Sequence, residues 1–269
     1  MRPGEVLASL VAILGIGWLV YGRKTSPKGD AVSAFPVPPP VSLSADKAAR
    51  LKGHLSAMTD GFRAVVKREP SRAELLYMTA IPGLETSWGR GWKCVANSPP
   101  ECAASEAQAK ASNNWGAIQA NAAWKGATFD WFDRYPDGRL YAQKFRAYAT
   151  PAEGAADVVR FIARLPRTME ALADGVSVFR MSLAMRREKY YGSFCPKAVA
   201  KFGASIAKPS FSEPDRDEGT RACEAEAVGL HAKRAYDIAL ELASAAGLEP
   251  VPLGTFEDAM AWYKGAGSA

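Results

Sequence analysis

Hydrophobic residues recur every three or four positions along most of the chain after residue 44, which is the spacing of helices that bury one face. Ser44 is a suitable N-cap for the first of these runs. The capping-box sequences SRAE at 71–74 and TPAE at 150–153 open two more, and Pro151 suits a first helical position. We therefore expect helices that begin at these three points, with further helices over about 175–188 and 221–246.

Residues 113–148 show a different pattern. Two short segments of alternating polarity, around 129–131 and 140–145, flank the turn sequence YPDG. We expect these segments to pair as a small antiparallel hairpin. The predicted fold class is thus mainly α, a helical domain with one β-hairpin.

The N-terminal segment is apolar enough to enter a membrane. No charged residue occurs from residue 6 to residue 22. This length is slightly below the roughly 20 residues of a typical spanning helix but within the usual range. A cleavable signal peptide is the alternative, although the small residues VSA at 32–34 lie too far beyond the apolar run. We interpret residues 1–21 as an uncleaved transmembrane helix.

The orientation of this anchor has two conflicting indicators. Three basic residues follow the apolar run and only Arg2 precedes it, which by the positive-inside rule keeps the body in the cytoplasm. The cysteines and the chemistry considered below favour export instead. We therefore expect the body to face the periplasm or cell envelope, or to belong to a virion if the gene is viral.

The rest of the chain divides by composition. Residues 22–43 are rich in Pro and Ser and lack periodicity, which predicts a linker, extended in part at ~3 Å per residue. We expect the main domain over 44–204. Residues 205–269 contain one more helical pattern, and we interpret them as a helical extension packed on that domain.

Charge narrows the choice of partner. The chain has 269 residues, a formal net charge of +6 and a pI near 9.1, which favours a polyanionic partner. Its basic residues are scattered, and no run of Lys and Arg is interleaved with aromatic residues. We therefore expect no nucleic-acid partner and favour an anionic cell wall or membrane surface.

Four cysteines occur without a C-x-x-C spacing, and the two histidines lie far from them in sequence. We therefore expect no metal site, and no cofactor. An even cysteine count in an exported protein favours disulfides. Of the three possible pairings we choose Cys94–Cys102 with Cys195–Cys223, because each joins sequence neighbours. Four buried free thiols are the alternative.

One acidic residue has the features of a general acid. Glu85 lies on the apolar stripe of its helix, in the last turn before Gly89. Burial disfavours a carboxylate and the helix C-terminus carries partial negative charge, so both raise the pKa of Glu85. A carboxyl group that stays protonated near neutral pH can protonate a glycosidic oxygen. The alternative is a surface glutamate paired with Arg90 or Lys93.

Residues suited to binding a sugar are close to Glu85 in sequence. The segment SNNWGAIQA at 112–120 supplies amides that can bond to N-acetyl and hydroxyl groups. Five of the seven tryptophans lie between residues 88 and 131, and indole faces pack on sugar rings. Some of the five are expected in the core. We place Asp157 on the solvent side of its helix and interpret His54 and His231 as structural.

Four segments carry a resemblance to a known family: ETSWGRGW, NNWGAIQ, FRAYATPAEGAADVVRFI and REKYYGSF. In order and spacing they resemble the lysozyme-like superfamily of peptidoglycan glycosidases, above all bacterial and phage glucosaminidase domains. The resemblance spans roughly residues 50–200. It implies a lysozyme-like α+β fold.

The resemblance also implies roles for the matching residues. It puts the catalytic acid on Glu85, and the similarity of GAIQ to a lytic-transglycosylase motif implies that Gln119 lines the sugar cleft. Two tyrosines of REKYYGSF fall where the superfamily often has a substrate-contacting tyrosine. The expected substrate-binding residues are Trp88, Asn114, Trp115, Gln119, Tyr190 and Tyr191.

The second acid of the family departs from its usual pattern. Glucosaminidase domains tend to carry a hairpin glutamate in a Thr-Glu-Tyr-x-x-Gly setting, and the matching stretch here is FDRYPDG. Arg134 occupies the glutamate position, with Asp133 beside it. Asp133 is our candidate for the catalytic base, and Asp130 is the other candidate.

These observations predict a membrane-anchored, exported enzyme that cleaves the glycan strands of peptidoglycan, with Glu85 as general acid. The first alternative is a lytic transglycosylase, in which Glu85 acts as both acid and base and the product is an anhydro sugar. The second is a non-catalytic wall-binding or assembly protein on a degenerate lysozyme scaffold, in a phage virion or a secretion apparatus.

Overall fold

The computed structural model describes residues 38–94, 100–134, 140–192, 194–207 and 216–265. All of them belong to one unit of the chain. The predicted anchor at 1–21 and most of the predicted linker lie outside the described residues. Within the described part, no helix combines the length and the apolar character needed to cross a membrane.

The helices that the hydrophobic pattern predicted are present and begin near the expected positions. They are α1 (Ala45–Val66), α2 (Arg72–Thr86), α4 (Pro151–Ile162), α6 (Val178–Arg187) and α8 (Glu218–Ala246).

The predicted N-caps close the first turns of three of these helices. The Ser44 hydroxyl accepts from the backbone N–H of Lys47 at 3.3 Å at the start of α1. At α2 the full capping box forms between Ser71 and Glu74. At α4 the Thr150 hydroxyl caps the helix. The capping box is incomplete, because the Glu153 carboxylate accepts from the backbone N–H of Ala149 instead of from that of Thr150.

Four helices were not predicted: α3 (Cys102–Ala111), α5 (Pro166–Asp174), α7 (Pro196–Phe202) and α9 (Phe256–Gly265). A 3-10 helix, η1 (Ala204–Ala207), follows α7. In two of the four, α5 and α7, a glutamate far along the chain caps the first turn. The Glu188 carboxylate accepts from the N–H groups of Arg167 and Thr168 in α5 at 3.0 and 2.9 Å. Glu226 of α8 does the same for Lys197 and Ala198 in α7.

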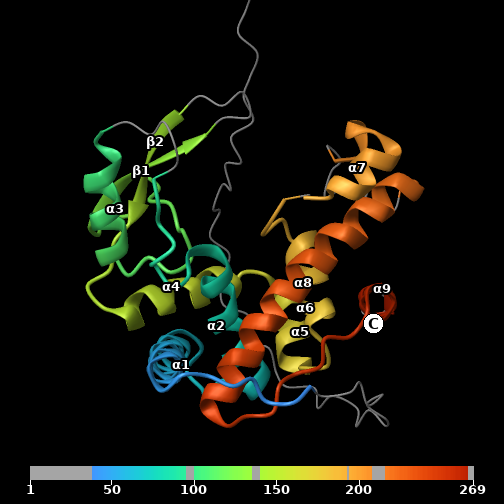
Figure 1. Ribbon diagram of the computed structural model, residues 1–269, viewed down its shortest axis with the longest axis horizontal. Helices are drawn as coiled ribbons and strands as arrows, with labels where there is room; N and C mark the ends of the chain where they lie inside the picture. The colour runs from blue at the N-terminus through green and yellow to red at the C-terminus, as the bar shows by residue number, and fades with distance from the viewer. Residues whose placement is uncertain (1–37, 95–99, 135–139, 193, 208–215, 266–269) are drawn as a thin grey trace, which may run out of the picture. The chain divides into compact units, whose positions relative to one another are not determined.

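The predicted hairpin consists of β1 (Thr128–Arg134) and β2 (Leu140–Arg146), paired antiparallel. Phe129 faces Phe145 across the pair, and both rings pack with Trp92 into a small aromatic core. An isolated bridge from Gln119 to Phe145 adds the preceding loop to the edge of this sheet. α3 packs against β1, so this helix and the hairpin form one local group (Figure 1).

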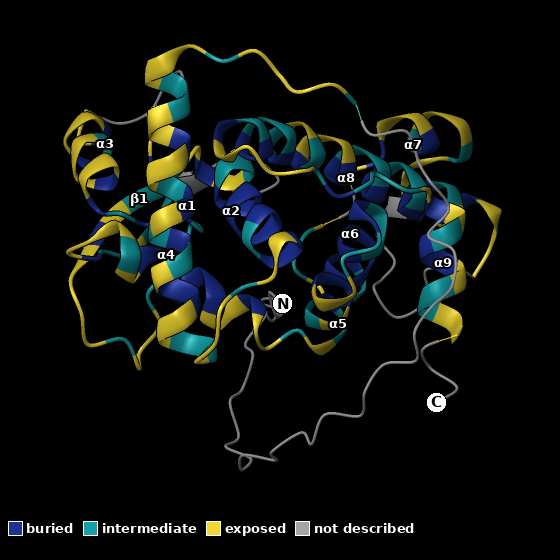
Figure 2. Ribbon diagram, turned by 90° about the horizontal axis from the view of Figure 1, so that it is seen from below, coloured by how far each residue is buried: buried dark blue, intermediate teal, exposed yellow. Residues whose placement is uncertain are grey.

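The main core surrounds α2. This helix contacts α1, α4, α5 and α8, and most of its length is buried (Figure 2). α8 runs beside α2 and α6 and reaches α7 at its other end (Figure 1). Its residues Ala235, Ala239 and Leu242 belong to the main hydrophobic cluster. α8 is therefore a central element of this unit.

The last residues of the predicted linker pack on the domain. Pro38, Pro39 and Pro40 line a shallow pocket against the C-terminal end of α8. The backbone N–H of Val41 donates to the Ser244 hydroxyl at 2.8 Å.

Both predicted disulfides are present, Cys94–Cys102 and Cys195–Cys223. The first joins the segment after α2 to the start of α3, and the second joins the start of α7 to α8. Each bridge therefore fixes one of the unpredicted helices to its neighbour.

The buried His231 makes stability depend on pH. Burial, with a smaller contribution from the charge of Arg234, lowers its pKa from 6.5 to about 4. Between these values the unfolded chain binds more protons than the folded one, so the free energy of unfolding falls as the pH drops from 6.5 towards 4. His231 alone accounts for a loss of about 2–3 kcal/mol over this window, and its contribution is complete above pH 6.5.

Urea unfolding at pH 7.5 and pH 4.5 measures this effect. We expect His231→Asn to lose about 2–3 kcal/mol less than the wild type between the two values, because Asn does not titrate. The difference between the two proteins removes the contribution of the other groups that titrate between these pH values. One of them is His54, because burial and two nearby arginines also lower its pKa to about 4. Equal losses in the two proteins would contradict the assignment.

Candidate functional site

Glu85 lies at the solvent-exposed end of an otherwise buried helix. The residues of α2 from Leu76 to Pro82 are buried, whereas the Glu85 side chain is exposed in the last turn. The surrounding protein nevertheless desolvates this carboxyl group and raises its pKa. The sequence predicted that Glu85 belongs to the buried stripe of its helix, and this is wrong, because its side chain is exposed. The predicted direction of its pKa shift, upward, agrees with the structure.

The alternative interpretation of Glu85 as one half of a surface ion pair finds no support. Among the described residues, neither Arg90 nor Lys93 forms a salt bridge with it. No hydrogen-bond partner of the Glu85 carboxyl group occurs in that part of the chain either. The carboxyl group is thus available to a ligand.

The chain turns sharply directly after Glu85. Ser87, Trp88 and Gly89 all have positive φ angles, of 49°, 55° and 82°. Such angles strain the two non-glycine residues, and strain of this kind concentrates at functional sites. The turn folds the Trp88 indole back along α2, where its Nε1 donates to the Thr79 carbonyl at 2.9 Å. Residue 83 must be glycine for this, because a Cβ there would lie 2.7 Å from the indole ring.

Thr86 joins this turn to the loop that carries the second motif. Its hydroxyl accepts from the Gly89 N–H at 2.8 Å and donates to the Trp115 carbonyl at 2.6 Å. The two sequence motifs around residues 85 and 115 therefore meet at the C-terminal end of α2. Each is held by the residue next to Glu85.

The loop residues themselves are more deeply buried than the sequence suggested. Asn114 is fully buried, and its amide bonds to the Ile118 N–H and to the carbonyls of Ile118 and Arg146. Trp115 is also buried. Asn114 thus shapes the loop and Trp115 packs in the core, and the substrate contacts expected of both stay predictions. Gln119, in contrast, has an exposed side chain at the edge of the hairpin.

A close approach of the loop to α4 explains why a glycine occupies position 154. A Cβ on that residue would lie 2.0 Å from the backbone oxygen of Asn113. The amide of Asn113 in turn donates to the Tyr148 carbonyl at 3.0 Å. The loop is therefore fixed between α2 and the first turn of α4.

His54 of α1 completes the packing around the turn. Its ring stacks on Trp88 at 4.5 Å between ring centroids and meets the edge of Trp115 at 5.2 Å. Burial, with the charges of Arg90 and Arg50, lowers the pKa of His54 to about 4. A neutral imidazole thus fills the space between the two indoles, which agrees with the structural role we expected for it. One face of Trp88 is occupied by this contact.

The two tyrosines of REKYYGSF have different surroundings. Burial raises the pKa of Tyr190 well above its usual value, and the negative charge of Glu85 raises it further, so Tyr190 lies near the candidate acid. The Tyr191 ring stacks on His231 at 4.1 Å, and its hydroxyl donates to the Ser182 carbonyl. Of the two tyrosines, only Tyr190 has a pKa on which the charge of Glu85 acts, whereas Tyr191 packs between α6 and α8.

The two hairpin aspartates, Asp130 and Asp133, both belong to β1. The Asp130 carboxylate forms a cross-strand ion pair with Lys144 at 3.0 Å in an exposed position. The backbone of Asp133 pairs with Tyr141. Its side chain lies outside the described residues, so the candidate base stays a prediction.

Asp157 is buried, which corrects the expectation that it faces solvent. Its carboxylate accepts from the Tyr148 hydroxyl at 2.5 Å and from Arg146 at 2.7 Å. Arg160 contacts its other oxygen at 3.4 Å. Arg146 in addition lies over the ring of Trp124. This network ties the end of β2 to α4, and so fixes the hairpin relative to the helices that carry the site.

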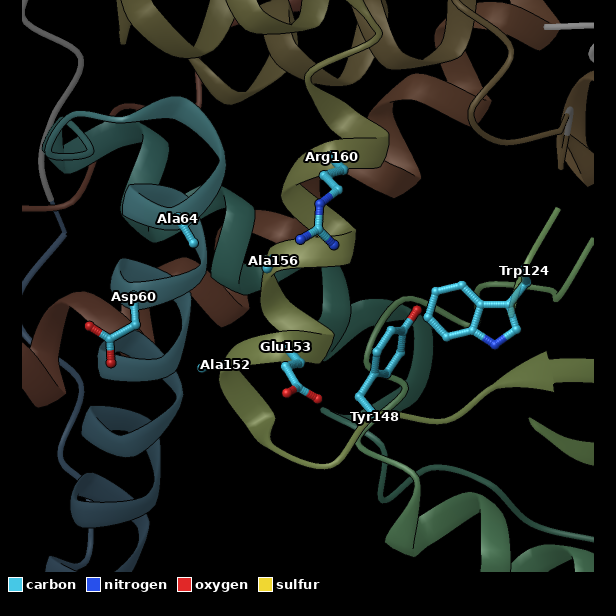
Figure 3. Close-up of a pocket in the computed structure, with 8 residues that line it drawn as sticks. All are labelled: Asp60, Ala64, Trp124, Tyr148, Ala152, Glu153, Ala156 and Arg160. Carbon is cyan, nitrogen blue, oxygen red and sulfur yellow. The ribbon is translucent and has the colours of Figure 1, made fainter. Parts of the chain in front are cut away.

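A pocket of about 300 Å³ lies on the outer side of this network, between α1 and α4 (Figure 3). The rings of Trp124 and Tyr148 meet edge to face on one side of it. Its lining residues are Asp60, Ala64, Trp124, Tyr148, Ala152, Glu153, Ala156 and Arg160. Of the residues that the sequence indicated for sugar binding, Trp124 lines it, and Glu85 does not. Within the described part of the chain, no group of three acidic, histidine or cysteine side chains could hold a metal ion.

Comparison with solved structures finds similar chains among glycoside hydrolases. One is the glycoside hydrolase domain of FlgJ from Salmonella typhimurium, at 18 % identity and a TM-score of 0.33, over 71 % of this chain and 97 % of that one. A C-terminally truncated form of that domain matches at 23 % identity and a TM-score of 0.31, over 48 % and 79 %. A peptidoglycan hydrolase mutant from Sphingomonas sp. A1 matches at 17 % identity and a TM-score of 0.32, over 68 % and 90 %.

No protein-family profile and no curated protein sequence matches the chain. The three structural neighbours belong to the class of protein that the sequence motifs resemble. At these identities and TM-scores the likeness carries no argument about activity, which has to come from the site itself.

Proposed function

We propose that this protein cleaves the glycan strands of peptidoglycan, with Glu85 as the general acid that protonates the glycosidic oxygen. The observation that carries this assignment is the environment of Glu85. Its carboxyl group reaches solvent, its pKa is raised by the surrounding protein, and no basic residue of the described chain neutralises it. A carboxyl group that keeps its proton near neutral pH and remains accessible to a ligand is what glycoside cleavage requires.

The order of the four sequence motifs supports the substrate class. ETSWGRGW and NNWGAIQ meet at the end of α2 through Thr86, and the tyrosine of REKYYGSF that follows α6 lies near Glu85. Two of the motifs are thus joined at the end of α2 that carries Glu85, and a third carries a tyrosine whose pKa responds to its charge. The two disulfides support our further proposal that the body faces the envelope, where such bonds persist.

The glucosaminidase reaction and the lytic transglycosylase reaction differ in what takes the place of the leaving sugar. Hydrolysis needs a second carboxylate to activate water, and Asp133 is our candidate for it. Asp130 is less suited, because its carboxylate is paired with Lys144. In the transglycosylase reaction the substrate's own hydroxyl attacks, and Glu85 serves as acid and then base.

Digestion of purified murein followed by mass analysis tests the proposed function. We expect soluble muropeptides with reducing ends, each heavier by one water than the anhydro products of a transglycosylase. Anhydro products would keep Glu85 as the acid and remove the role of Asp133. A protein that co-sediments with murein but releases nothing would contradict catalysis and indicate a wall-binding protein.

A further inference from the structure

Phe161 is a large apolar side chain that its helix leaves exposed. It lies in the last turn of α4, where its neighbours Val158, Val159 and Ile162 are all buried. Phe161 itself is 43 % exposed. The helix therefore buries one face completely and presents a phenyl ring to solvent beside it.

The ring lies beside Tyr190. Phe161 contacts Tyr190 at 5.7 Å between ring centroids, with the planes at 72°. Burial and, to a smaller extent, the charge of Glu85 raise the pKa of Tyr190. An edge contact of this kind covers less of a ring than stacking does, so a large part of the phenyl group remains open to a ligand.

The tryptophans that the sequence indicated for sugar stacking are engaged elsewhere. Trp92 and Trp115 are buried, and Trp88 stacks on His54. Trp131 meets Trp92 edge to face, and Trp124 lies under the guanidinium of Arg146. Among the described residues, Phe161 is an exposed aromatic side chain with a ring contact to Tyr190.

A phenyl ring has a definite chemical preference. It carries no hydrogen-bonding atom, so it cannot select a hydroxyl or an amide, but its face packs against the C–H face of a pyranose ring. Such a contact holds the sugar flat and leaves its polar groups free to bond elsewhere. The position beside Tyr190 is suited to a sugar next to the bond that Glu85 protonates.

We propose that Phe161 is a sugar-binding residue, a platform on which one pyranose ring of the glycan strand packs when the adjacent glycosidic bond reaches Glu85. This assignment rests on the proposed function, because the ligand is named from the substrate of Glu85. Phe161 contributes binding and orientation and takes no part in proton transfer.

Kinetics on soluble, uncrosslinked glycan strands test this role. Phe161→Leu keeps an apolar side chain but removes the flat face, so we expect KM to rise by about 3–10-fold with kcat little changed. Phe161→Trp restores a flat ring and should return KM towards the wild-type value. Leu248→Ser is the control, because Leu248 is also exposed, at 37 %, but follows α8 far from REKYYGSF in the sequence. It should leave KM unchanged.

Co-sedimentation with insoluble murein separates this inference from the proposed function. Phe161→Leu combined with Glu85→Gln should bind murein about 3–10-fold more weakly than Glu85→Gln alone, whether or not the strands are cleaved. A wild-type KM and wild-type binding for Phe161→Leu would overturn the role of Phe161 while leaving the activity in place. A loss that Phe161→Trp fails to recover would also overturn it, because the flat ring would then not be the cause.

Discussion

Replacement of Glu85 by Gln is expected to reduce murein cleavage by at least about 10²-fold while the protein remains folded. Gln has nearly the same shape but holds no proton that it can give to a leaving oxygen. The side chain is exposed, and no hydrogen bond from it supports the described fold, so the substitution should cost little stability. Release of soluble muropeptides measures the activity, and thermal unfolding checks the fold.

The pH dependence of the wild-type enzyme gives a second measure of the same group. The raised pKa of Glu85 means that its carboxyl group keeps its proton to a higher pH than an ordinary glutamate. Cleavage should therefore decrease as the pH rises through this raised pKa. Glu249→Gln serves as a matched control, because Glu249 is an exposed glutamate paired with Arg72 at 3.2 Å. Wild-type activity in folded Glu85→Gln would remove Glu85 from the mechanism.

Replacement of Asp157 by Ala is expected to reduce the free energy of unfolding by about 3–5 kcal/mol. The Asp157 side chain is only 6 % exposed and is the shared acceptor for Arg146 and Tyr148. Its removal leaves a largely buried guanidinium and a buried hydroxyl without this partner, and desolvated groups of this kind are costly to leave unpaired. Urea unfolding gives the measurement.

The chain offers a matched control for this prediction. Asp130 also pairs with a basic residue, but its side chain is 56 % exposed and that of Lys144 is 65 % exposed. Exposed pairs contribute little, so Asp130→Ala should change the free energy of unfolding by less than about 1 kcal/mol. Equal effects of the two substitutions would show that the Asp157 network does not fix the hairpin.

Local signals in the sequence were sufficient for the long elements. Helices such as α1 and α2 carry their own caps in Ser44 and Ser71, together with regular apolar spacing, and both features act within one turn of the helix. The hairpin likewise follows from alternation around a turn signal. These predictions succeeded because the interactions that define each element lie inside it.

The short helices α5 and α7 escaped prediction for the opposite reason. Their first N–H groups bond to Glu188 and Glu226, residues about 20 and 28 positions further along the chain. A helix of seven to nine residues is marginal on its own, and here the cap exists only after distant segments have come together. No pattern within the helix records such a cap.

The candidate site divides in a similar way. The sequence motifs indicated Glu85 as the acid and Tyr190 as a substrate-binding residue. They could not show which side chains the fold buries and which it leaves exposed. Asn114 and Trp115 have the chemistry of sugar contacts and are buried by the packing of their loop. Phe161 belongs to an apolar helix by its composition, and only the folded structure shows that its ring is exposed.

The central position of α8 bears on how this protein can be shortened. All four motifs of the site end before residue 200, which would suggest a free-standing catalytic fragment. α8 nevertheless packs along α1, α2 and α6, supplies the Glu226 carboxylate that caps α7, and holds Cys223 of the second disulfide. A fragment that stops at residue 204 would expose the apolar side of α2, the helix on which Glu85 is carried. The smallest fragment that folds on its own must therefore include α8, because this helix packs on the helix that carries Glu85. Such a fragment extends well past the last residue of the four motifs.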